Sequence, residues 1–498
     1  MIELTLENYR AFGPKLPAHI TIQRGVTALI GHNNAGKSLT LRFFFEMRPL
    51  FALLAEQERP PGDNEVFPLP TPQGVRDRNA IFHRSDQGPM RITLDYKHGP
   101  ITILIDRGDF SLRILGAKED NWRRILPIFH SFRHSLYFGA HRSMGRSSKA
   151  LEQDSEPIEG FCQLWTKAIR DHPRQMEEAR AEVYDAMRRL FSFSDFSAEV
   201  HEEGRVILKA DQIETEIGEA GSGVSQAFLL MAQSAAFQPH YILIDEPECH
   251  LHPGCQIDFV TLMQGFAKYG LIAATHNLGL ARAISEQVYQ VQSVSAKGLC
   301  EIRPYQETNP RLSQSLGELD YAAQVESGCQ KILLVEGPTE VKAIRQLLSK
   351  IKGGKGVIIL PLGGSSMING RRQEELAEIS RICPNVYALI DSEKSSARAH
   401  LSDQHADFLN SCRETGIQAY ALERRAFENY LTAQAVDRIL GKKYRALKPF
   451  EDVNRSFPKW PKSENWRVVR AMKIDDFKGT DLYEFILKVI QDSCEVPQ

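Results

Sequence analysis

The sequence predicts a protein of the mixed α/β class, built from two α/β parts in series. In the first part, the apolar strand-like run 26–30 leads through a glycine-bounded loop into a helix-like run, 39–45. An alternating stretch, 90–115, is typical of antiparallel strands, and 159–192 has a charged, helical pattern. From residue 331, three apolar strand-like runs are separated by helix-length segments, which indicates a parallel sheet.

The length of 498 residues exceeds that of one ordinary domain, so we expect two or three. The first domain is predicted over 1–305, with a mixed sheet and a helical, dimerising insertion at about 159–192. A polar linker is predicted over 306–330. The second domain is predicted over 331–498, with a parallel sheet and a basic C-terminal subdomain.

The composition places the chain among globular proteins, with 42% apolar and 25% charged residues. No apolar run approaches the ~20 residues that span a bilayer, and residues 1–6 alternate like a strand rather than a signal peptide. The eight cysteines include no Cys-x-x-Cys pair, so we expect reduced thiols in a cytoplasmic protein. Because the net charge is −2, any binding of nucleic acid must come from a local patch.

A phosphate-binding loop is predicted between the first strand and helix, with the sequence Gly31-His32-Asn33-Asn34-Ala35-Gly36-Lys37-Ser38. Its glycines let backbone N–H groups curl around phosphates, and the helix N-terminus adds partial positive charge. We expect Lys37 to reach the β- and γ-phosphates of ATP and Ser38 to hold Mg²⁺. The other nucleotide contacts expected here are Asn33, Asn34, Gly36 and Thr40. The alternative, a glycine-rich turn that matches by chance, is disfavoured by the strand and helix on either side.

Two later strand ends carry the residues expected to act on the nucleotide. The run 241–244 is followed by Asp245, predicted to bind the Mg²⁺ shell, and by Glu246, predicted to polarise the attacking water. The run 271–275 ends at His276, which we expect to sense the γ-phosphate. Upstream, Ser222-Gly223 opens a helix, a second anion site that would cap the ATP of a partner subunit.

The strands of the second part also end in polar residues. Glu336, with Glu340 one helical turn later, follows the run 331–335, and Asp391-Ser392-Glu393 follows the run 386–390. Because parallel strands end at one edge of a sheet, these carboxylates are expected to meet there, with Mg²⁺ or Mn²⁺ between them. Two such ions could clamp the oxygens of a phosphodiester displacement. The alternative is a structural sheet with solvated acids, which three motifs in order disfavour.

The order of phosphate loop, Ser-Gly, Asp-Glu and His resembles that of the ATP-binding-cassette (ABC) ATPases, in particular the branch of chromosome-maintenance and DNA-repair ATPases. The usual Leu-Ser-Gly-Gly-Gln signature is absent, and no glutamine loop is obvious. The resemblance implies ATP sandwiched between two heads, and hence a homodimer or higher oligomer. Arg142 resembles an arginine of related ATPases; a solvated surface arginine is the equal alternative.

The second part resembles the topoisomerase–primase (Toprim) domain, although Asp391-Ser392-Glu393 departs from that domain's Asp-x-Asp. An ABC-type ATPase followed by Toprim resembles the overcoming-lysogenisation-defect (OLD) family of nucleases. Residues 422–431 resemble its Glu-Asn-Tyr-Leu segment, and 476–482 its Lys-Gly motif. The resemblance implies four metal ligands, an outer ligand or organiser at Glu428, and a lysine that neutralises charge on the scissile phosphate. The ligands are Glu336, Glu340, Asp391 and Glu393, and the lysine is Lys478.

The segment 438–473 is locally basic, with eleven Lys and Arg against three acids and with five aromatic residues interleaved. These are Tyr444, Phe450, Phe457, Trp460 and Trp466. Basic residues with stackable rings suit a nucleic-acid backbone and unpaired bases. A solvated subdomain whose aromatic residues form its core explains the pattern equally well.

The resemblance implies an ATP-hydrolysing, metal-dependent DNA endonuclease of bacterial anti-phage defence, in which the ATPase gates cleavage. Three alternatives stay open at this point. The chain could be an ATPase scaffold that controls a co-encoded partner effector, or its Toprim part could cut RNA such as tRNA. A DNA-repair ATPase is the third alternative, although the helices of 159–192 are too short for the long coiled coil of such proteins.

Overall fold

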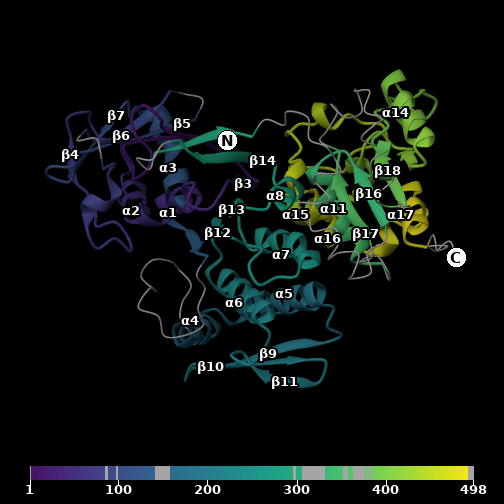
Figure 1. Ribbon diagram of the computed structural model, residues 1–498, viewed down its shortest axis with the longest axis horizontal. Coiled ribbons are helices and arrows are strands. Elements are labelled where there is room, and N and C mark those ends of the chain that lie inside the picture. The colour runs from purple at the N-terminus through teal and green to yellow at the C-terminus, as the bar shows by residue number, and fades with distance from the viewer. Residues whose placement is uncertain are drawn as a thin grey trace. The chain divides into compact units, whose positions relative to one another are not determined.

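The computed structural model describes most of the chain, which divides into two compact units (Figure 1). The described residues are 2–84, 88–96, 99–140, 158–294, 299–305, 331–351, 357–362, 376–377, 379–380, 383 and 385–491. Unit 1 comprises Met1–His276 and Gln287–Gln306, and unit 2 comprises Asn277–Glu286 and Glu307–Gln498. Arg142 and the predicted linker 306–330 lie outside the described residues. The predicted mixed α/β class is confirmed.

The central sheet of unit 1 has six strands and mixed direction. Five strands are parallel, and the edge strand β15 is antiparallel to β14. In order across the sheet they are β15 (Cys300–Pro304), β14 (Gln287–Ser293), β3 (Gly25–Ile30), β13 (Gly270–Thr275), β12 (Tyr241–Asp245) and β8 (Ser135–Phe138). Every residue of β3, β12 and β13 is buried, so these apolar runs form the centre of the unit. Their carboxyl ends meet at one edge, where a parallel sheet places its ligands.

A second, antiparallel sheet forms the N-terminal lobe of unit 1. Its strands are β2 (Ala18–Ile22), β1 (Ile2–Glu7), β5 (Met90–Asp95), β6 (Ile101–Ile105), β7 (Ser111–Leu115) and β4 (Val66–Pro68), in that order. Three helices share its core: α1 (Lys37–Glu46), α2 (Arg48–Ala55) and α3 (Glu119–Arg133). Phe43, Phe44 and Phe51 of α1 and α2 pack edge-on, and Phe44 contacts Phe132 of α3. This aromatic packing anchors the helix that follows the phosphate loop.

The predicted helical stretch is a helix pair, α4 (Ile158–Asp171) and α5 (Pro173–Phe191). It packs with α6 (Ser222–Phe237) and α7 (Pro253–Gly265). A three-stranded antiparallel sheet follows α5, with β9 (Phe196–His201), β10 (Arg205–Ala210) and β11 (Ile213–Glu216). Figure 1 shows this small sheet beyond the helices α4 to α6. The short helix η1 (Arg78–Ile81) belongs to the N-terminal lobe.

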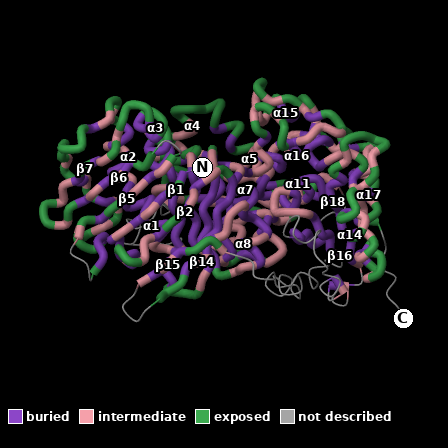
Figure 2. Tube along the Cα trace, turned by 90° about the horizontal axis from the view of Figure 1, so that it is seen from above, coloured by how far each residue is buried: buried purple, intermediate pink, exposed green. Residues whose placement is uncertain are grey.

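Unit 2 contains a four-stranded sheet in which every pairing is parallel. Its strands are β17 (Val357–Pro361), β16 (Lys331–Val335), β18 (Val386–Ile390) and β19 (Gln418–Ala421), in that order. The three strands predicted from the sequence are thus present and parallel, and β19 adds a fourth. Every residue of β17 and β18 is buried, and Figure 2 colours such buried stretches of the chain purple. Because β16 and β18 are neighbours, Glu336 and Asp391 follow adjacent strand ends.

Helices cover this sheet and form the core with it. The longer ones are α8 (Leu278–Ile284), α11 (Pro338–Leu348), α14 (Asp403–Glu414), α15 (Ala433–Leu440), α16 (Asn465–Ala471) and α17 (Asp481–Gln491). Single turns are η4 (Phe427–Tyr430), η5 (Val453–Arg455), η6 (Lys462–Glu464) and η7 (Ile474–Asp476). Among the described residues, no helix combines the length and apolar character needed to cross a bilayer.

Candidate functional site

The phosphate loop connects β3 to α1, and its glycines are required by close packing. Gly36 immediately precedes α1 with a φ of 106°, in the left-handed region that favours glycine. A Cβ there would lie 2.7 Å from the Cys300 Sγ, and a Cβ on Gly31 would lie 2.2 Å from the Val291 carbonyl oxygen. No side chain fits at either position without displacing its neighbour. The loop is therefore held close to β14 and β15, with the α1 N-terminus at its end.

The predicted nucleotide-contacting residues lie along this single turn of chain. The buried Lys37 donates from Nζ to the carbonyl oxygens of Gly31 (2.7 Å) and His32 (3.1 Å). The Thr40 hydroxyl donates to the Gly36 carbonyl oxygen at 3.3 Å. Ser38 is half-buried at the start of α1, and Asn33 and Asn34 are exposed at the loop tip. The side-chain amine and the helix N-terminus thus serve the same loop, as an anion site requires.

Asp245 and Glu246 lie at the carboxyl end of β12, at the same sheet edge as the loop. Asp245 is the last residue of the strand and is 3% exposed. The Glu246 backbone N–H donates to the Ala274 carbonyl oxygen at 2.7 Å, which ties this turn to β13. Glu246 has a φ of 52°, which is uncommon for a residue with a side chain and belongs to the tight turn that follows β12.

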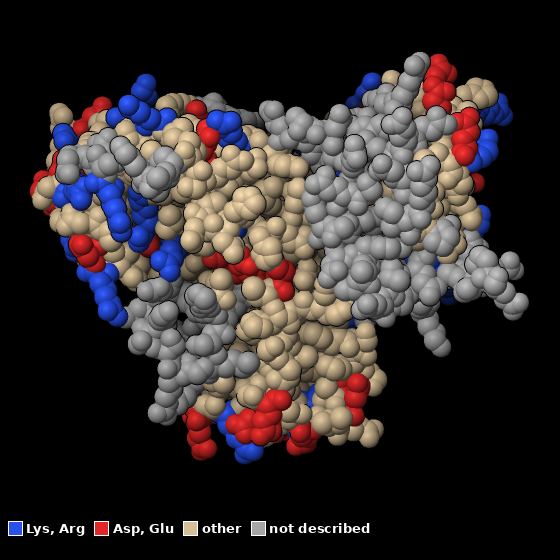
Figure 3. Space-filling model, viewed as in Figure 1, with Lys and Arg blue, Asp and Glu red and all other residues tan. Residues whose placement is uncertain are grey.

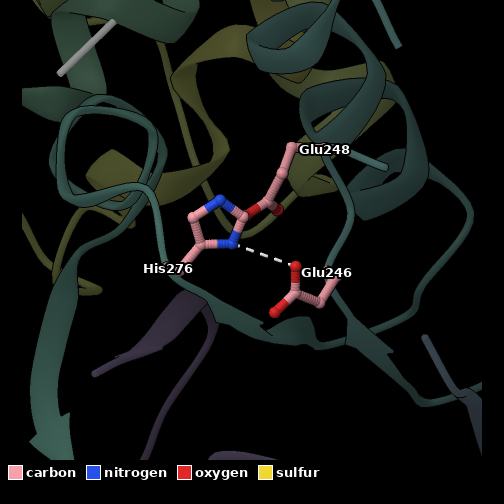
Figure 4. A group of neighbouring side chains, drawn as sticks. All are labelled: Glu246, Glu248 and His276. Atoms are coloured by element: carbon pink, nitrogen blue, oxygen red, sulfur yellow. Dashed lines mark hydrogen bonds and ion pairs between the residues drawn. The ribbon is translucent and has the colours of Figure 1, made fainter. Parts of the chain in front are cut away.

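Glu246 and Glu248 both face His276, which follows β13 (Figure 4). The His276 Nδ1 lies 3.0 Å from the Glu246 Oε2 and 3.3 Å from the Glu248 Oε1. The Thr275 hydroxyl also donates to the Glu248 Oε1. Burial raises the pKa of Glu248, and the neighbouring Glu246 charge adds to this. Of the described residues, Glu246, Glu248 and His276 form the group whose metal-ligand atoms all lie within 4.8 Å of one another.

Sequence reasoning did not assign a role to Glu248. The signal available was its spacing, two residues after Glu246 with a proline between them. That spacing alone does not show which way the side chain points. The paired strands β12 and β13 bring Glu248 and His276 together.

Ser222 and Gly223 are the first two residues of α6, as the sequence predicted for a helix start. Ser222 is exposed and Gly223 is half-buried. A Cβ on Gly223 would lie 2.4 Å from the His250 carbonyl oxygen, so glycine is needed for the approach of the loop that follows β12. The α6 N-terminus is therefore close in space to the turn that carries Glu246 and Glu248.

The structure adds a buried polar network beside α1 that sequence reasoning missed. Glu46 accepts hydrogen bonds from the Tyr9 hydroxyl (2.8 Å) and the Arg10 Nε (3.0 Å). Burial and the Glu46 charge raise the pKa of Tyr9 well above its usual value. Two cavities of about 520 and 540 Å³ adjoin Arg10. Figure 3 shows Lys and Arg side chains gathered on this lobe, and Arg42, Arg76, Arg84 and Arg107 line the cavities.

A second centre lies at the carboxyl edge of the unit 2 sheet, and we call Glu336, Glu340, Asp391 and Glu428 the acidic centre. The Asp391 backbone N–H donates to the Glu336 Oε1 at 2.8 Å, and the Phe427 N–H donates to the Asp391 Oδ1 at 2.9 Å. The Thr339 hydroxyl donates to the Glu340 Oε1 at 2.9 Å. Glu428 has no exposed surface, and its Oε2 has no hydrogen-bond partner.

Burial and mutual repulsion perturb the acidic centre strongly. Burial, with the Glu428 charge next in importance, raises the pKa of Glu340 to about 7. Burial also raises the pKa of Glu336, and it raises the pKa of Asp391 well above its usual value, with Glu336 adding to the latter. Such a cluster favours protons or cations because ionised carboxylates at this density repel one another.

The lysine that the structure brings to the acidic centre is Lys462. Its Nζ lies 3.5 Å from the Glu428 Oε1, which also accepts from the Asn465 Nδ2 at 2.9 Å. The predicted lysine, Lys478, instead forms an exposed ion pair with Asp475 at 2.6 Å, one helical turn away in sequence. Its partner is local because Lys478 and Asp475 belong to one surface turn. Lys462 belongs to the basic segment 438–473, and nothing in the sequence distinguishes it from the ten other Lys and Arg residues there.

Glu393, the predicted ligand in the Asp-x-Glu motif, is exposed. Its backbone N–H donates to the Arg425 carbonyl oxygen at 2.9 Å, with a φ of 51°. Its charge contributes to the raised pKa of Glu336. Glu393 thus lies close enough to influence the acidic centre, while its own carboxylate faces solvent.

Comparison with known proteins supports the nucleotide site. A family model described as an AAA ATPase domain matches residues 143–281, which include Asp245, Glu246 and His276. No curated protein matches the chain. Residues 143–281 of the first unit are thus similar to an AAA ATPase domain, in agreement with the predicted ATP binding.

Several solved structures are similar at low identity. One is the SMC head domain from Thermotoga maritima, with a TM-score of 0.36 and 14% identity, covering 61% of this chain and 98% of that chain. Another is an SmcHead bound to the C-winged helix domain of ScpA, with a TM-score of 0.41 and 14% identity; the match covers 61% of this chain and 97% of that chain. A third is an Smc head domain with an extended coiled coil, bound to the C-terminal domain of ScpA derived from Pyrococcus furiosus. Its TM-score is 0.38 at 13% identity, and the match covers 65% of this chain and 100% of that chain.

Proposed function

We propose that the chain is an ABC-type ATPase whose second unit is a Toprim-like, metal-dependent endonuclease that acts on DNA. One observation carries the nuclease part. Glu336 and Asp391 follow adjacent parallel strands and meet with Glu340, Glu428 and Lys462 in one centre, in which Glu340, Asp391 and Glu428 are buried. A structural sheet has no need of four carboxylates in one place, where burial and then the neighbouring carboxylates raise the pKa values of Glu340 and Asp391.

At the ATPase centre, each residue has a chemical task. Lys37 exchanges its bonds to the loop carbonyls for bonds to phosphate oxygens, and the α1 N-terminus stabilises their charge. Ser38 and Asp245 would hold Mg²⁺, whose charge neutralises the β- and γ-phosphates. Glu246 orients and polarises the attacking water, and His276 lies beside it to contact the γ-phosphate. The cavity of about 520 Å³, which is lined by Arg10 and by Leu39 of α1, has room for the nucleoside.

The acidic centre fits Mg²⁺ or Mn²⁺ on the chemistry of its donors. All its ligand atoms are carboxylate oxygens, and the buried Glu428 Oε2 has no hydrogen-bond partner. Glu336, Glu340 and Asp391 would hold the ions, with Glu393 joining from the surface. When bound, the ions supply charge neutralisation at the phosphodiester. Lys462 takes the role that the family resemblance suggested for Lys478, since it can stabilise negative charge on a phosphate oxygen.

The biological setting that this architecture supports best is anti-phage defence, through the resemblance to the OLD family. In this role the ATPase unit senses or gates and the acidic centre cleaves phosphodiesters. The exposed N-terminus of α6, with Ser222 and Gly223, supports a homodimer in which each head caps the ATP of the other. The protein is then proposed to act in the cytoplasm.

A second function is favoured by the position of Glu393. Its exposed carboxylate and the longer side chain leave the Asp-x-Asp geometry incomplete. A site of this kind would suit a different phosphodiester substrate, such as tRNA, or a scaffold that controls a partner effector.

Plasmid cleavage with Mg²⁺ or Mn²⁺, with and without ATP, tests the proposal. We expect wild-type protein to nick DNA, and Asp391→Asn to abolish nicking while ATP hydrolysis persists. Asp407→Asn is the matched control, because Asp407 is an exposed aspartate on α14. Lys37→Ala then shows whether ATP activates or restrains cleavage. Cleavage that survives Asp391→Asn would refute the nuclease assignment, and cleavage of tRNA alone would establish the second function.

A further inference from the structure

The structure separates the aromatic residues of the basic segment 438–473 into three groups by their burial. Trp460 and Trp466 are 5% and 1% exposed and belong to the core of unit 2. Tyr444 and Phe450 are half-buried. Phe457 is 100% exposed. Two of the five rings thus form core, and one is presented to solvent, so the nucleic-acid interpretation of this segment stays a prediction that concerns Phe457.

Full exposure of a phenylalanine is unusual and contributes nothing to folding by burial. Among the described residues, the next most exposed large apolar side chain is Ile213, at 66%. Phe237, the other phenylalanine in this group, is 49% exposed. Phe457 thus stands apart from ordinary surface apolar residues.

The turn that carries Phe457 is held from both sides. The Ser456 hydroxyl donates to the Val453 carbonyl oxygen (2.8 Å) and accepts from the Trp460 backbone N–H (3.0 Å). The indole of Trp460 donates to the Asn465 Oδ1 at 2.9 Å. These bonds close the turn 456–460 on the core, so that the ring is presented by an ordered segment. A rigid aromatic surface loses little entropy when a flat partner stacks on it.

The same segment leads directly to the acidic centre. Two residues after the Trp460 anchor, Lys462 lies 3.5 Å from Glu428. Asn465 connects the Trp460 anchor to the acidic centre, because it accepts a hydrogen bond from Trp460 and donates one to Glu428. Phe457 is therefore five residues from the site cation, within the ~17 Å that such a length of chain can span.

The charges around Phe457 are predominantly positive. Arg455, with a side chain 88% exposed, and Lys459, also exposed, flank the ring in sequence. Lys442 and Lys448 add exposed cations on the same segment. Of the acids there, Glu451 pairs with Arg445, and Asp452 pairs with both Arg425 and Arg455. A solvent-facing ring among cations is complementary to a polyanion with flat, unstacked faces.

We propose that Phe457 is a stacking platform for an unpaired base of a single-stranded or looped nucleic acid, whose backbone Arg455 and Lys459 contact. This rests on the proposed nuclease function and names its substrate class. In a continuous duplex the bases stack on one another and offer no free face, whereas an unpaired base can stack on an aromatic side chain. Such a base would position the neighbouring phosphodiester for the acidic centre.

Binding without cleavage tests this, using the full chain in EDTA and fluorescence anisotropy. The probes are labelled single-stranded DNA, single-stranded RNA, a hairpin and a blunt duplex. We expect Phe457→Ala to weaken binding of the probes with unpaired bases about 5- to 100-fold, since one stacked base contributes ~1–3 kcal/mol. Duplex binding should stay within about twofold, and Phe457→Trp should restore affinity. The stronger of the DNA and RNA arms identifies the substrate.

Phe237→Ala, at an exposed phenylalanine of unit 1, is the matched control and should bind as wild type does. Equal affinity of Phe457→Ala and wild type for single strands would overturn the proposal, as would absence of binding by wild type. An equal loss for duplex and single strands would also overturn it, because stacking requires unpaired bases. Phe457-dependent sedimentation with anionic vesicles in place of nucleic acid would assign the ring to a membrane. If binding depends on Phe457 but the protein cleaves no nucleic acid, the stacking role of Phe457 stands and the proposed nuclease function is refuted.

Discussion

Each unit of the molecule has a cluster of carboxylates at the carboxyl edge of parallel strands, and the two clusters differ in their surroundings. In unit 1, Glu246 and Glu248 face His276, whose side chain is 57% exposed. In unit 2, Glu340, Asp391 and Glu428 are buried, and the described cation beside them is Lys462. The same structural device, a buried strand that ends in acids, thus produces two electrostatic environments.

The clusters differ in the number of carboxylates and in the cationic group beside them rather than in burial alone, because Glu248 in unit 1 is as buried as Glu340 and Asp391 in unit 2. The exposed imidazole of His276 lies beside the partly exposed Glu246, which gives this carboxylate access to water and suits activation of a water molecule. In unit 2, four carboxylates surround one lysine, and burial together with this excess of negative charge raises the pKa values of Glu340 and Asp391 and favours divalent cations. Substitutions in the two clusters should expose this contrast, and their expected effects differ in size.

Removing the charge of Glu246 should have the largest effect. We expect Glu246→Gln to lower the kcat for ATP hydrolysis by about 10²- to 10⁴-fold, because a general base is lost while nucleotide binding persists. Phosphate release measures the rate, and a fluorescent nucleotide measures binding. Glu214→Gln, at an exposed glutamate of β11, is the control. ATP hydrolysis by Glu246→Gln at the wild-type rate would show that Glu246 is not the general base.

The acidic centre should make the folded protein less stable as pH rises, whereas a carboxylate in an ordinary salt bridge makes it more stable. The pKa of Glu340 is raised from 4.5 to about 7, so the folded protein holds its proton more tightly than the unfolded chain does. Without divalent metal, stability should therefore fall as pH rises from about 4.5 to about 7 and level off above that.

Thermal unfolding in EDTA and in Mg²⁺ measures this effect. Mg²⁺ should raise the melting temperature more at pH 8 than at pH 6, because it competes with protons for the carboxylates. Glu340→Gln should flatten the pH dependence. An equal Mg²⁺ effect at both pH values, with Glu340→Gln unchanged from wild type, would show that this centre does not bind cations.

Removing the cation of the acidic centre should have a smaller effect. Lys462→Met leaves the carboxylates without their neighbouring positive charge and should lower the melting temperature in EDTA. Because the Lys462 side chain is 41% exposed, solvent screens the pair, and we expect a shift of about 2–4 °C. Lys478→Met should leave the melting temperature unchanged, since Lys478 pairs with Asp475 on the surface. A larger fall in melting temperature for Lys478→Met than for Lys462→Met would show that Lys478, and not Lys462, neutralises the acidic centre.

The smallest effect is expected at Glu248. The Thr275 hydroxyl holds its Oε1 beside the His276 Nδ1, so this carboxylate positions the imidazole. Glu248→Ala should free the imidazole and lower kcat about 3- to 10-fold with KM for ATP little changed, as the loss of one ~1 kcal/mol hydrogen bond predicts. Glu248→Gln, which keeps an acceptor oxygen, should recover most of the rate. A change in KM alone would contradict a positioning role.

The sequence predicted much of the local structure around both centres. The loop 31–38, the strands that precede Asp245, Glu336 and Asp391, and the parallel arrangement in unit 2 follow from apolar runs and their spacing. Helix starts at Lys37 and Ser222 follow from glycines before apolar stretches. These features depend on residues near in sequence, which is why periodicity and turn residues indicate them.

The tertiary structure alone decided which distant side chains meet and which rings are buried. It brings Lys462 rather than Lys478 to Glu428, and it brings Glu248 to His276. It also buries Trp460 while it exposes Phe457, three residues away on the same basic segment. Local patterns determine strands, loops and helix ends because those depend on neighbouring residues, whereas burial and charge pairing depend on packing between segments that are remote in sequence.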